Sequence, residues 1–274
     1  MDTSADLLLL KVAIAPAFVG LVSVLALTYG HRAAGWLVAL PINTATILIV
    51  LTLSEGASFA ATAAVGALVG VVSLSAFAIG YGRSAPRFPW SLCLGIASAG
   101  FVTSTLILSA IPENVIGGLV AAVVAVGVVL LVVRVPEGPA PSGTAPYWEI
   151  PVRMATAAVL VFSVTTAADA LGPRLSGLLS PIPVFTITLV IFTHSRFGPS
   201  PVFVFLNGLL LGLFSFAAFC AVVAVLLVPY GLVVSLGAGL VAFIGVYGLV
   251  RGLSYFLGNR GGNRSDATSR QDSS

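Results

Sequence analysis

The chain has 274 residues, of which 58% are hydrophobic and only 8% are charged, and its mean hydropathy is +1.12. Soluble globular proteins carry roughly 25% charged residues, so this composition excludes a soluble domain of this length. The net charge of +3 is scattered over loops without interleaved aromatic residues, which excludes a nucleic-acid-binding surface. We therefore expect a single domain embedded in a lipid bilayer.

Nine apolar runs each approach the ~20 residues that cross the hydrocarbon core of a bilayer. They predict transmembrane helices at 9–29, 33–53, 58–80, 89–111, 115–135, 152–171, 175–193, 201–228 and 232–253. The first run lacks a basic segment before it and a cleavage site after it, so we interpret it as a helix rather than a signal peptide. The eighth run is long enough to tilt or break near Val223, which leaves ten spans as an alternative.

Basic residues are distributed unevenly between the two sides of these spans. With the N-terminus outside, only Lys11 and Arg174 lie on the outer side, and the inner side holds Arg32, Arg83, Arg87, Arg134, Arg153, Arg196, Arg251, Arg260, Arg264 and Arg270. Cytoplasmic loops are enriched in Lys and Arg, so we predict a cell-membrane protein with its N-terminus outside and its C-terminus in the cytoplasm.

An internal repeat emerges when the chain is aligned with itself at an offset of 142 residues. This register pairs Gly30 with Gly172, Arg32 with Arg174, Gly35 with Gly177, Pro41 with Pro183, Thr44 with Thr186, Gly56 with Gly198, Gly66 with Gly208, Gly70 with Gly212, Ser73 with Ser215 and Phe77 with Phe219. Self-similarity at one fixed period indicates repeated structural units. The repeat covers the first four and the last four predicted spans.

The fifth predicted span, 115–135, has no counterpart in the repeat and would connect the two halves. Because a single span connects them, the second half begins on the opposite side of the membrane from the first, so the two halves have opposite orientations. The predicted fold is therefore an all-α transmembrane bundle of about nine helices, arranged as a 4+1+4 inverted repeat. Its predicted parts are a first repeat at 1–111, a connector helix and cytoplasmic linker at 112–150, a second repeat at 151–257 and a disordered cytoplasmic tail at 258–274.

The two cations on the outer side each have a repeat partner on the inner side, because Lys11 pairs with Arg153 and Arg174 pairs with Arg32. This pairing suggests a local role that both halves share. Arg32 and Arg174 follow Gly30 and Gly172 at the ends of predicted spans one and six, and one interpretation is a helix C-cap, in which arginine lies beside the last exposed carbonyl groups. The other interpretation is attraction of an anionic substrate.

The candidate substrate site lies where Pro41-x-x-Thr44 and Pro183-x-x-Thr186 fall near the middle of spans two and seven. A proline there removes a backbone hydrogen bond, and the exposed backbone groups must then meet protein or a cavity rather than lipid. Broken helices at a repeat interface hold substrates in carriers. We expect Asn43, Thr44 and Thr186 to line one central cavity, although a simple kink with threonine bonded back to its own helix is the alternative.

Secondary candidates come from small and hydroxyl residues on spans three and eight. The Gly66-x-x-x-Gly70 and Gly208-x-x-x-Gly212 pairs favour close helix packing. Ser73 and Ser215 lie about one turn further along, facing either the cavity or a neighbouring helix. The full set of candidate substrate-binding residues is Pro41, Asn43, Thr44, Ser73, Pro183, Thr186 and Ser215.

Enzymatic function is not expected, because the sequence has no catalytic constellation and no metal-ligand spacing. His31 and His194 lie at predicted membrane edges, and Asp169 lies near the outer end of its span beside Arg174. We expect no cofactor and no bound metal. Cys93 and Cys220 lie inside apolar runs and are interpreted as buried structural thiols.

Each half has a cation opening its first span (Lys11, Arg153) and Gly-x-x-x-x-x-Pro-x-x-Thr in its second, and in this it resembles the GlpM-like small four-helix inner-membrane proteins. The resemblance implies a bacterial inner-membrane location. The duplicated four-helix plan is also similar to the small multidrug resistance and drug/metabolite transporter families. This chain has no acid in span one, and the acid in span six, Asp169, lies near the outer end rather than at mid-span, which argues against export of cationic drugs.

Two functions are consistent with these patterns. The first is a small secondary transporter that carries a neutral or anionic solute by alternating access. The second is a membrane scaffold or accessory protein of a cell-envelope pathway, in which the prolines and glycines serve packing only. A polar cavity that reaches Thr44 and Thr186 would favour the transporter, and a dry interface there would favour the scaffold.

Overall fold

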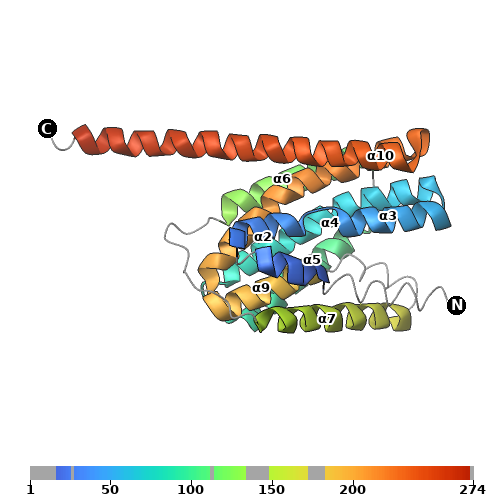
Figure 1. Ribbon diagram of the computed structural model, residues 1–274, viewed down its shortest axis with the longest axis horizontal. Helices are drawn as coiled ribbons and strands as arrows, with labels where there is room; N and C mark the ends of the chain where they lie inside the picture. The colour runs from blue at the N-terminus through green and yellow to red at the C-terminus, as the bar shows by residue number, and fades with distance from the viewer. Residues whose placement is uncertain (1–16, 26–27, 112–113, 134–147, 172–182, 272–274) are drawn as a thin grey trace.

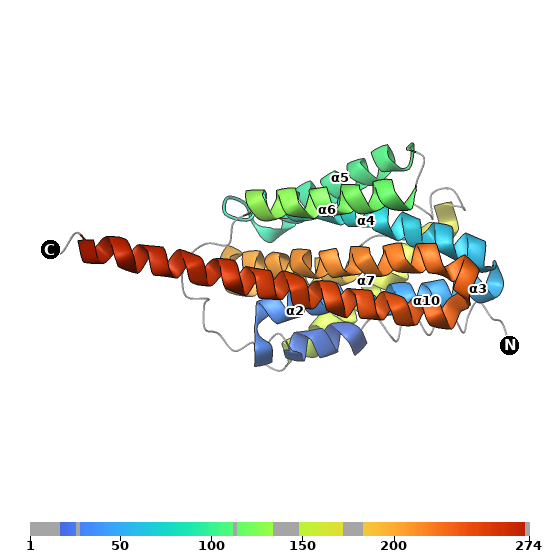
Figure 2. The ribbon, with the colours of Figure 1, turned by 90° about the horizontal axis from the view of Figure 1, so that it is seen from above.

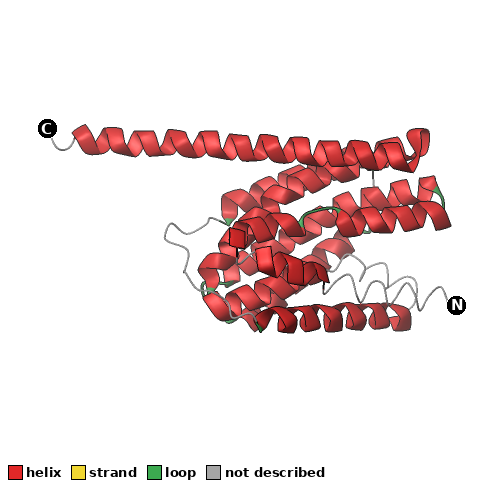
Figure 3. Ribbon diagram, viewed as in Figure 1, coloured by secondary structure: helices red, strands yellow, loops and turns green. Residues whose placement is uncertain are grey.

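The protein is helical throughout the part described by the computed structural model, which comprises residues 17–25, 28–111, 114–133, 148–171 and 183–271. Side chains are described in these ranges except at 43, 161, 164–171 and 253–271. No strand occurs in these ranges (Figure 3). After a helical segment at 17–25, the helices are α2 (His31–Val38), α3 (Ile42–Ser54), α4 (Ala57–Ser84), α5 (Trp90–Leu108), α6 (Val115–Val132), α7 (Glu149–Leu171), α9 (Val184–Phe197) and α10 (Pro199–Gln271).

Four of the described helices are long and apolar enough to cross a membrane, by length and composition: α4, α5, α6 and the stretch of α10 from Pro199 to Gly252. Their outer faces carry large apolar side chains that are widely exposed, among them Ile116, Leu131, Val233 and Leu249. A soluble monomer rarely exposes contiguous apolar surface of this extent. The fold therefore has the character of a membrane protein, with its outer faces suited to lipid.

The centre of the bundle is the packing of α4 against α10. Helix α4 contributes Leu68, Phe77 and Tyr81, and α10 contributes Phe205 and Phe219, all almost completely buried. Helices α5 and α6 pack on α4, and α2 packs on α10 (Figure 2). Cys93 and Cys220 are buried free thiols within this core, which confirms their interpretation as structural residues.

Helix α2 crosses α10 at very close range because both helices have glycine at the crossing. A Cβ atom built on Gly35 would meet the backbone of Phe205 and would lie 2.7 Å from the backbone nitrogen of Leu209. A Cβ atom on Gly208 would likewise meet the backbone carbonyl of Arg32. Small residues permit such backbone approach between membrane helices. The predicted packing role of Gly208 is therefore confirmed.

Helix boundaries recur at the same 142-residue offset as the sequence repeat. Pro41 precedes α3 and Pro183 precedes α9. Gly56 and Gly198 both have positive φ, 94° and 76°, in the turns that separate α3 from α4 and α9 from α10. Gly231, also with positive φ (78°), is the repeat partner of Pro89, which precedes α5.

Equivalent turns lie at opposite ends of the bundle. The α3–α4 turn is at the right-hand end of the bundle in Figure 1, whereas the α9–α10 turn is at the left-hand end. Consequently α3 and α9 run in opposite directions along the bundle. The same holds for α4 and the first arm of α10, which is the part of α10 before Gly231. Helix α6, the predicted connector, lies beside α4 and α10.

Two expectations for the C-terminal part differ from the structure. Helix α10 changes direction at Gly231, which confirms the predicted boundary between 201–228 and 232–253, and it is helical through Val223, so the alternative break near Val223 is wrong. A left-handed glycine after Pro229 turns the chain more readily than the apolar run around Val223, which has no residue that interrupts a helix. The backbone of α10 continues helically through Gln271, where the sequence predicts a disordered tail, and an existing helix elongates without the cost of a new nucleus.

Candidate functional site

The candidate site is organised by the interruption of the second predicted span at Pro41. Helix α2 ends at Val38 and α3 begins at Ile42, so the predicted break is present in the structure. The amide of Leu40 donates to the carbonyl oxygen of Leu37 at 3.1 Å, which closes α2 with a tighter final turn. Pro41 itself is buried and is the N-cap residue of α3, a position where the missing amide hydrogen removes no hydrogen bond of the helix.

Pro183 holds the equivalent position before α9, with φ −80° close to the −77° of Pro41. The carbonyl oxygens of both prolines accept the first backbone hydrogen bond of the helix that follows, at 2.7 Å from Ala45 and 2.8 Å from Ile187. The part of the seventh predicted span before Pro183, including Gly177, lies outside the described residues. The local geometry of the two halves is therefore alike on the C-terminal side of each proline.

Thr44 and Thr186 differ from the threonines around them in their hydrogen bonds. Thr46 and Thr188 each donate to the carbonyl oxygen four residues before, at 2.9 Å. Among the described residues, the hydroxyl groups of Thr44 and Thr186 make no hydrogen bond, although Thr44 is half-buried and Thr186 is only 1% exposed. Hydroxyl groups in such surroundings are normally paired. For Thr44 the carbonyl oxygen four residues before belongs to Leu40, and no bond to it forms, so the back-bonding alternative does not hold there. For Thr186 that carbonyl belongs to Ile182, which lies outside the described residues, so the alternative stays open.

The two broken spans meet through α2 and α9, whereas α3, which carries Thr44, lies apart from α9, which carries Thr186. Helices α3 and α9 do not contact each other in the described part of the chain. Helix α3 packs on α4 and α10, whereas α9 packs on α5, α7 and α10. The expectation that Asn43, Thr44 and Thr186 line one cavity stays a prediction, and the Asn43 side chain lies outside the described residues.

Ser73 and Ser215 occupy equivalent places on α4 and α10 but have different surroundings. The Thr105 hydroxyl lies 2.9 Å from the Ser73 hydroxyl, which ties α5 to α4. Ser215 is fully buried, and its hydroxyl has no hydrogen-bond partner among the described residues. The repeat partner of Thr105 is Tyr247, whose hydroxyl accepts a hydrogen bond from Arg251 at 2.9 Å. Ser73 therefore contributes to helix packing, whereas the Ser215 hydroxyl group stays without a hydrogen-bond partner among the described residues.

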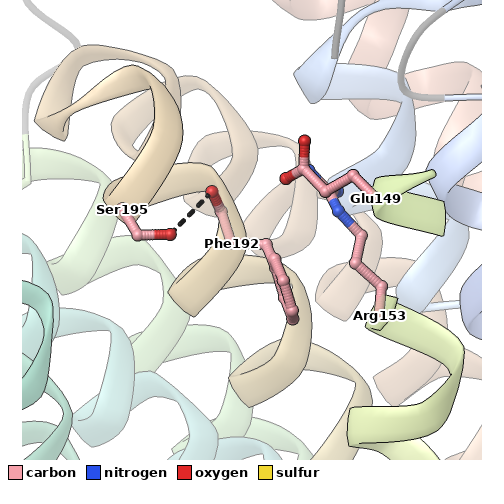
Figure 4. Close-up of polar contacts among 4 residues, drawn as sticks. All are labelled: Glu149, Arg153, Phe192 and Ser195. Atoms are coloured by element: carbon pink, nitrogen blue, oxygen red, sulfur yellow. Dashed lines mark hydrogen bonds and ion pairs between the residues drawn. The ribbon is translucent and has the colours of Figure 1, made fainter. Parts of the chain in front are cut away.

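A buried ion pair lies at the N-terminal end of α7. Arg153 donates to the Glu149 carboxylate at 2.9 Å, and the two side chains are only 4% and 6% exposed. The guanidinium also lies over the Phe192 ring on α9 (Figure 4), at 5.3 Å from the ring centre. The second carboxylate oxygen of Glu149 is buried without a hydrogen-bond partner among the described residues. Burial of two charges is costly unless each is paired; because both charges lie on α7, the contact with α9 is the one between Arg153 and Phe192.

Aromatic and histidine contacts extend this polar end of the bundle. The Tyr81 hydroxyl on α4 lies 3.0 Å from Nδ1 of His194 on α9. His31 at the start of α2 packs edge-on against Phe197, with ring centres 5.4 Å apart. Burial and, secondarily, the positive charge of Arg153 lower the pKa of His31 from its ordinary value of 6.5. The N-terminal ends of α2 and α7 therefore meet the C-terminal ends of α4 and α9.

Sequence reasoning missed Glu149, which it assigned to the linker at 112–150. The available signal was its spacing of four residues before Arg153, because oppositely charged side chains at that spacing face each other on a helix. The local role suggested for Lys11 and Arg153 stays a prediction, since Lys11 lies outside the described residues. Arg153 itself forms the ion pair with Glu149. The C-cap suggested for Arg32 and Arg174 also stays a prediction, because Arg174 lies outside the described residues.

Comparison with protein-family models, with curated proteins and with solved structures finds no match for this chain. The fold and site define its class: an all-helical protein, in the part described, with helices able to cross a membrane and a broken helix ahead of an unpaired threonine. Within the described residues, no cluster of three or more histidine, cysteine or acidic side chains is placed to hold a metal ion.

Proposed function

We propose that the protein is a small secondary transporter of the cell membrane, which binds a neutral or anionic solute between two inversely oriented halves. The observation that carries this proposal is the recurrence of helix boundaries at an offset of 142 residues, with equivalent turns at opposite ends of the bundle. Inverted repeats of this kind characterise alternating-access carriers, whose substrate sites lie near the middle of the membrane at the repeat interface.

The proposed halves are 1–111 and 151–257, with α6 as the connector. A rotation of about 180° around an axis in the membrane plane would superpose them. Such a rotation reverses chain direction, which agrees with the opposite directions of α3 and α9. It also keeps α4 and the first arm of α10 adjacent at the centre, as their close packing requires.

The substrate contacts proposed are the hydroxyl groups of Thr44 and Thr186, assisted by Asn43. Both hydroxyl groups follow a helix-breaking proline by three residues and have no partner among the described residues. A hydroxyl group can donate to an anionic group or accept from a neutral one, which suits either class of solute. Asn43 is paired with Phe185 in the repeat, so the two sides of the site would differ in polarity.

The polar end of the bundle is proposed to face the cytoplasm. Three helix ends that each carry an arginine lie there: the N-terminal end of α7 carries Arg153, the C-terminal end of α9 carries Arg196, and the C-terminal end of α4 carries Arg83. Glu55, by contrast, follows α3 at the opposite end. Enrichment of positive charge on the cytoplasmic side is the general rule for membrane helices.

A ligand screen with matched variants tests the proposal. Purified protein is heated in the presence of neutral and anionic metabolites, and compounds that raise the unfolding temperature are retained. Thr44→Val and Thr186→Val are expected to remove that stabilisation, because each deletes an unpaired hydroxyl group. Thr46→Val and Thr188→Val are the controls, since their hydroxyl groups already bond to their own helices.

The screen also separates the transporter from a membrane scaffold. If a scaffold is correct, no compound will stabilise the protein, or stabilisation will be equal in all four variants. In that case the prolines and glycines serve packing alone.

A further inference from the structure

A pocket at the polar end of the bundle combines two arginines with an apolar floor. It has a volume of about 420 Å³ and lies between the C-terminal ends of α4 and α6 and the start of α10. Its lining comprises Gly82, Arg83, Pro86, Arg87, Val132, Val133 and Phe203. This pocket lies apart from the threonine site, and no role assigned above uses it.

The two arginines of this pocket are available to an external anion. Both side chains are exposed, and neither forms an ion pair within the described residues. The guanidinium of Arg87 lies 3.5 Å from the Arg83 carbonyl oxygen, which keeps the two side chains on the same face of the turn that ends α4. Both arginines line the same pocket, and guanidinium groups bind phosphate oxygens through several charge-assisted hydrogen bonds.

The floor of the pocket is apolar and closely packed. A Cβ atom on Gly82 would lie 2.6 Å from a methyl carbon of Val133, so α4 and α6 touch directly below the arginines. Phe203, from the first turns of α10, is 7% exposed and closes one side. A free inorganic anion gains nothing from such a floor, whereas the glycerol and first acyl carbons of a lipid do.

Aromatic residues beside the arginines indicate the level of the membrane at which this pocket lies. Phe88 and Trp90, which follow Arg87 directly, are 44% and 40% exposed. Exposed aromatic side chains at the ends of membrane helices gather at the level of lipid headgroups. The pocket opens at the same end of α4 and α5, so its arginines lie at headgroup depth.

We propose that this pocket binds the headgroup of an anionic phospholipid, with the phosphate held by Arg83 and Arg87 and the start of an acyl chain against Val133 and Phe203. Basic pockets between membrane helices are known to hold anionic lipid headgroups. The proposal does not depend on solute transport. It requires only that α4, α5 and α6 cross the membrane.

Native mass spectrometry of the purified protein tests this site with two defined lipids, phosphatidylglycerol and phosphatidylethanolamine. We expect tighter binding of phosphatidylglycerol, weakened by about tenfold or more in the double variant Arg83→Gln/Arg87→Gln. The control is Arg32→Gln/Arg196→Gln, which removes the same charge from two exposed arginines outside the pocket and should keep the preference. Arg83→Lys/Arg87→Lys should retain more binding than the glutamine pair.

Three results would overturn the proposal. The first is equal affinity for the two lipids, and the second is an equal loss in both glutamine variants, which would indicate nonspecific charge attraction. The third is displacement of phosphatidylglycerol by millimolar inorganic phosphate or glycerol phosphate, which would indicate a site for a soluble anion. The unfolding temperature of each variant without added lipid distinguishes lost binding from lost folding.

Discussion

Thr46 and Thr188, which are 142 residues apart, make the same hydrogen bond, each donating to the carbonyl oxygen four residues before at 2.9 Å. Two residues earlier, Thr44 and Thr186 make none among the described residues. Thr52, Thr62 and Thr156 also donate to the carbonyl oxygen four residues before, so this bond is common to threonines in these helices and does not by itself indicate a repeat. The absence of the bond at Thr44 is therefore the feature that distinguishes the candidate site.

The α2–α10 crossing makes a prediction about glycine. Gly35→Ala should lower the free energy of unfolding by roughly 1–3 kcal/mol, because the new methyl group meets the backbone of Phe205 and Leu209. Gly70→Ala is the control, since a Cβ atom there meets nothing within 4 Å, and it should be neutral or slightly stabilising. Unfolding in mixed detergent micelles measures both, and equal effects would contradict the described crossing.

The buried ion pair makes a second prediction. Arg153→Met should destabilise the protein by about 3–5 kcal/mol, because Glu149 would be left buried without its partner. The double variant Glu149→Leu/Arg153→Met should recover much of that loss, since no charge remains to be desolvated. A thermodynamic cycle of the single and double variants measures the coupling. Additive effects of the two substitutions would show that the side chains do not interact.

The lowered pKa of His31 predicts that the free energy of unfolding depends on pH. Its pKa is lowered in the folded protein by burial and by Arg153, so the unfolded chain binds the proton more readily. Stability conferred by the neutral imidazole is fully present above pH 6.5 and is lost as the pH falls through the folded-state pKa. The unfolding temperature should fall from pH 7 to pH 5, and His31→Gln should make that fall smaller. An unchanged slope in the variant would exclude His31 as its source.

The distribution of charge predicts the orientation in the membrane. In a background without Cys93 and Cys220, a cysteine at Glu55 should react with an impermeant thiol reagent added outside the cell. A cysteine at Pro86, in the turn after α4, should react only after the cytoplasmic side is opened. Reaction of both positions from one side would contradict the proposed topology, because α4 joins these two turns.

The helix positions and helix breaks that were predicted correctly from the sequence are those that local chemistry determines. Pro41 removes an amide hydrogen and so predicts the break that separates α2 from α3. Helices α4, α5 and α6 follow from apolar runs of membrane-spanning length. The turn at Gly231 lies between the predicted spans 201–228 and 232–253, so that boundary was also predicted correctly, because Pro229 and a left-handed glycine interrupt the apolar run there.

Contacts between helices that are far apart in the chain were harder to predict from the sequence. Glu149 is buried only because α7 docks on α9, and no local pattern indicates that contact. The separation of α3 from α9 likewise depends on how α4 and α10 pack at the centre. For the same reason the candidate site could be located to two helix breaks, whereas its closure into one cavity could not be established.

Two-sided accessibility of the threonine positions tests the central claim most directly. Cysteine is placed singly at Thr44 and Thr186 in the background without Cys93 and Cys220, and an impermeant thiol reagent is applied to vesicles of each orientation. Alternating access predicts that both positions react from both sides, while a control cysteine at Thr46, which is exposed on the apolar face of α3, does not react. Failure of both positions to react from either side, or reaction from one side alone, would contradict a transporter.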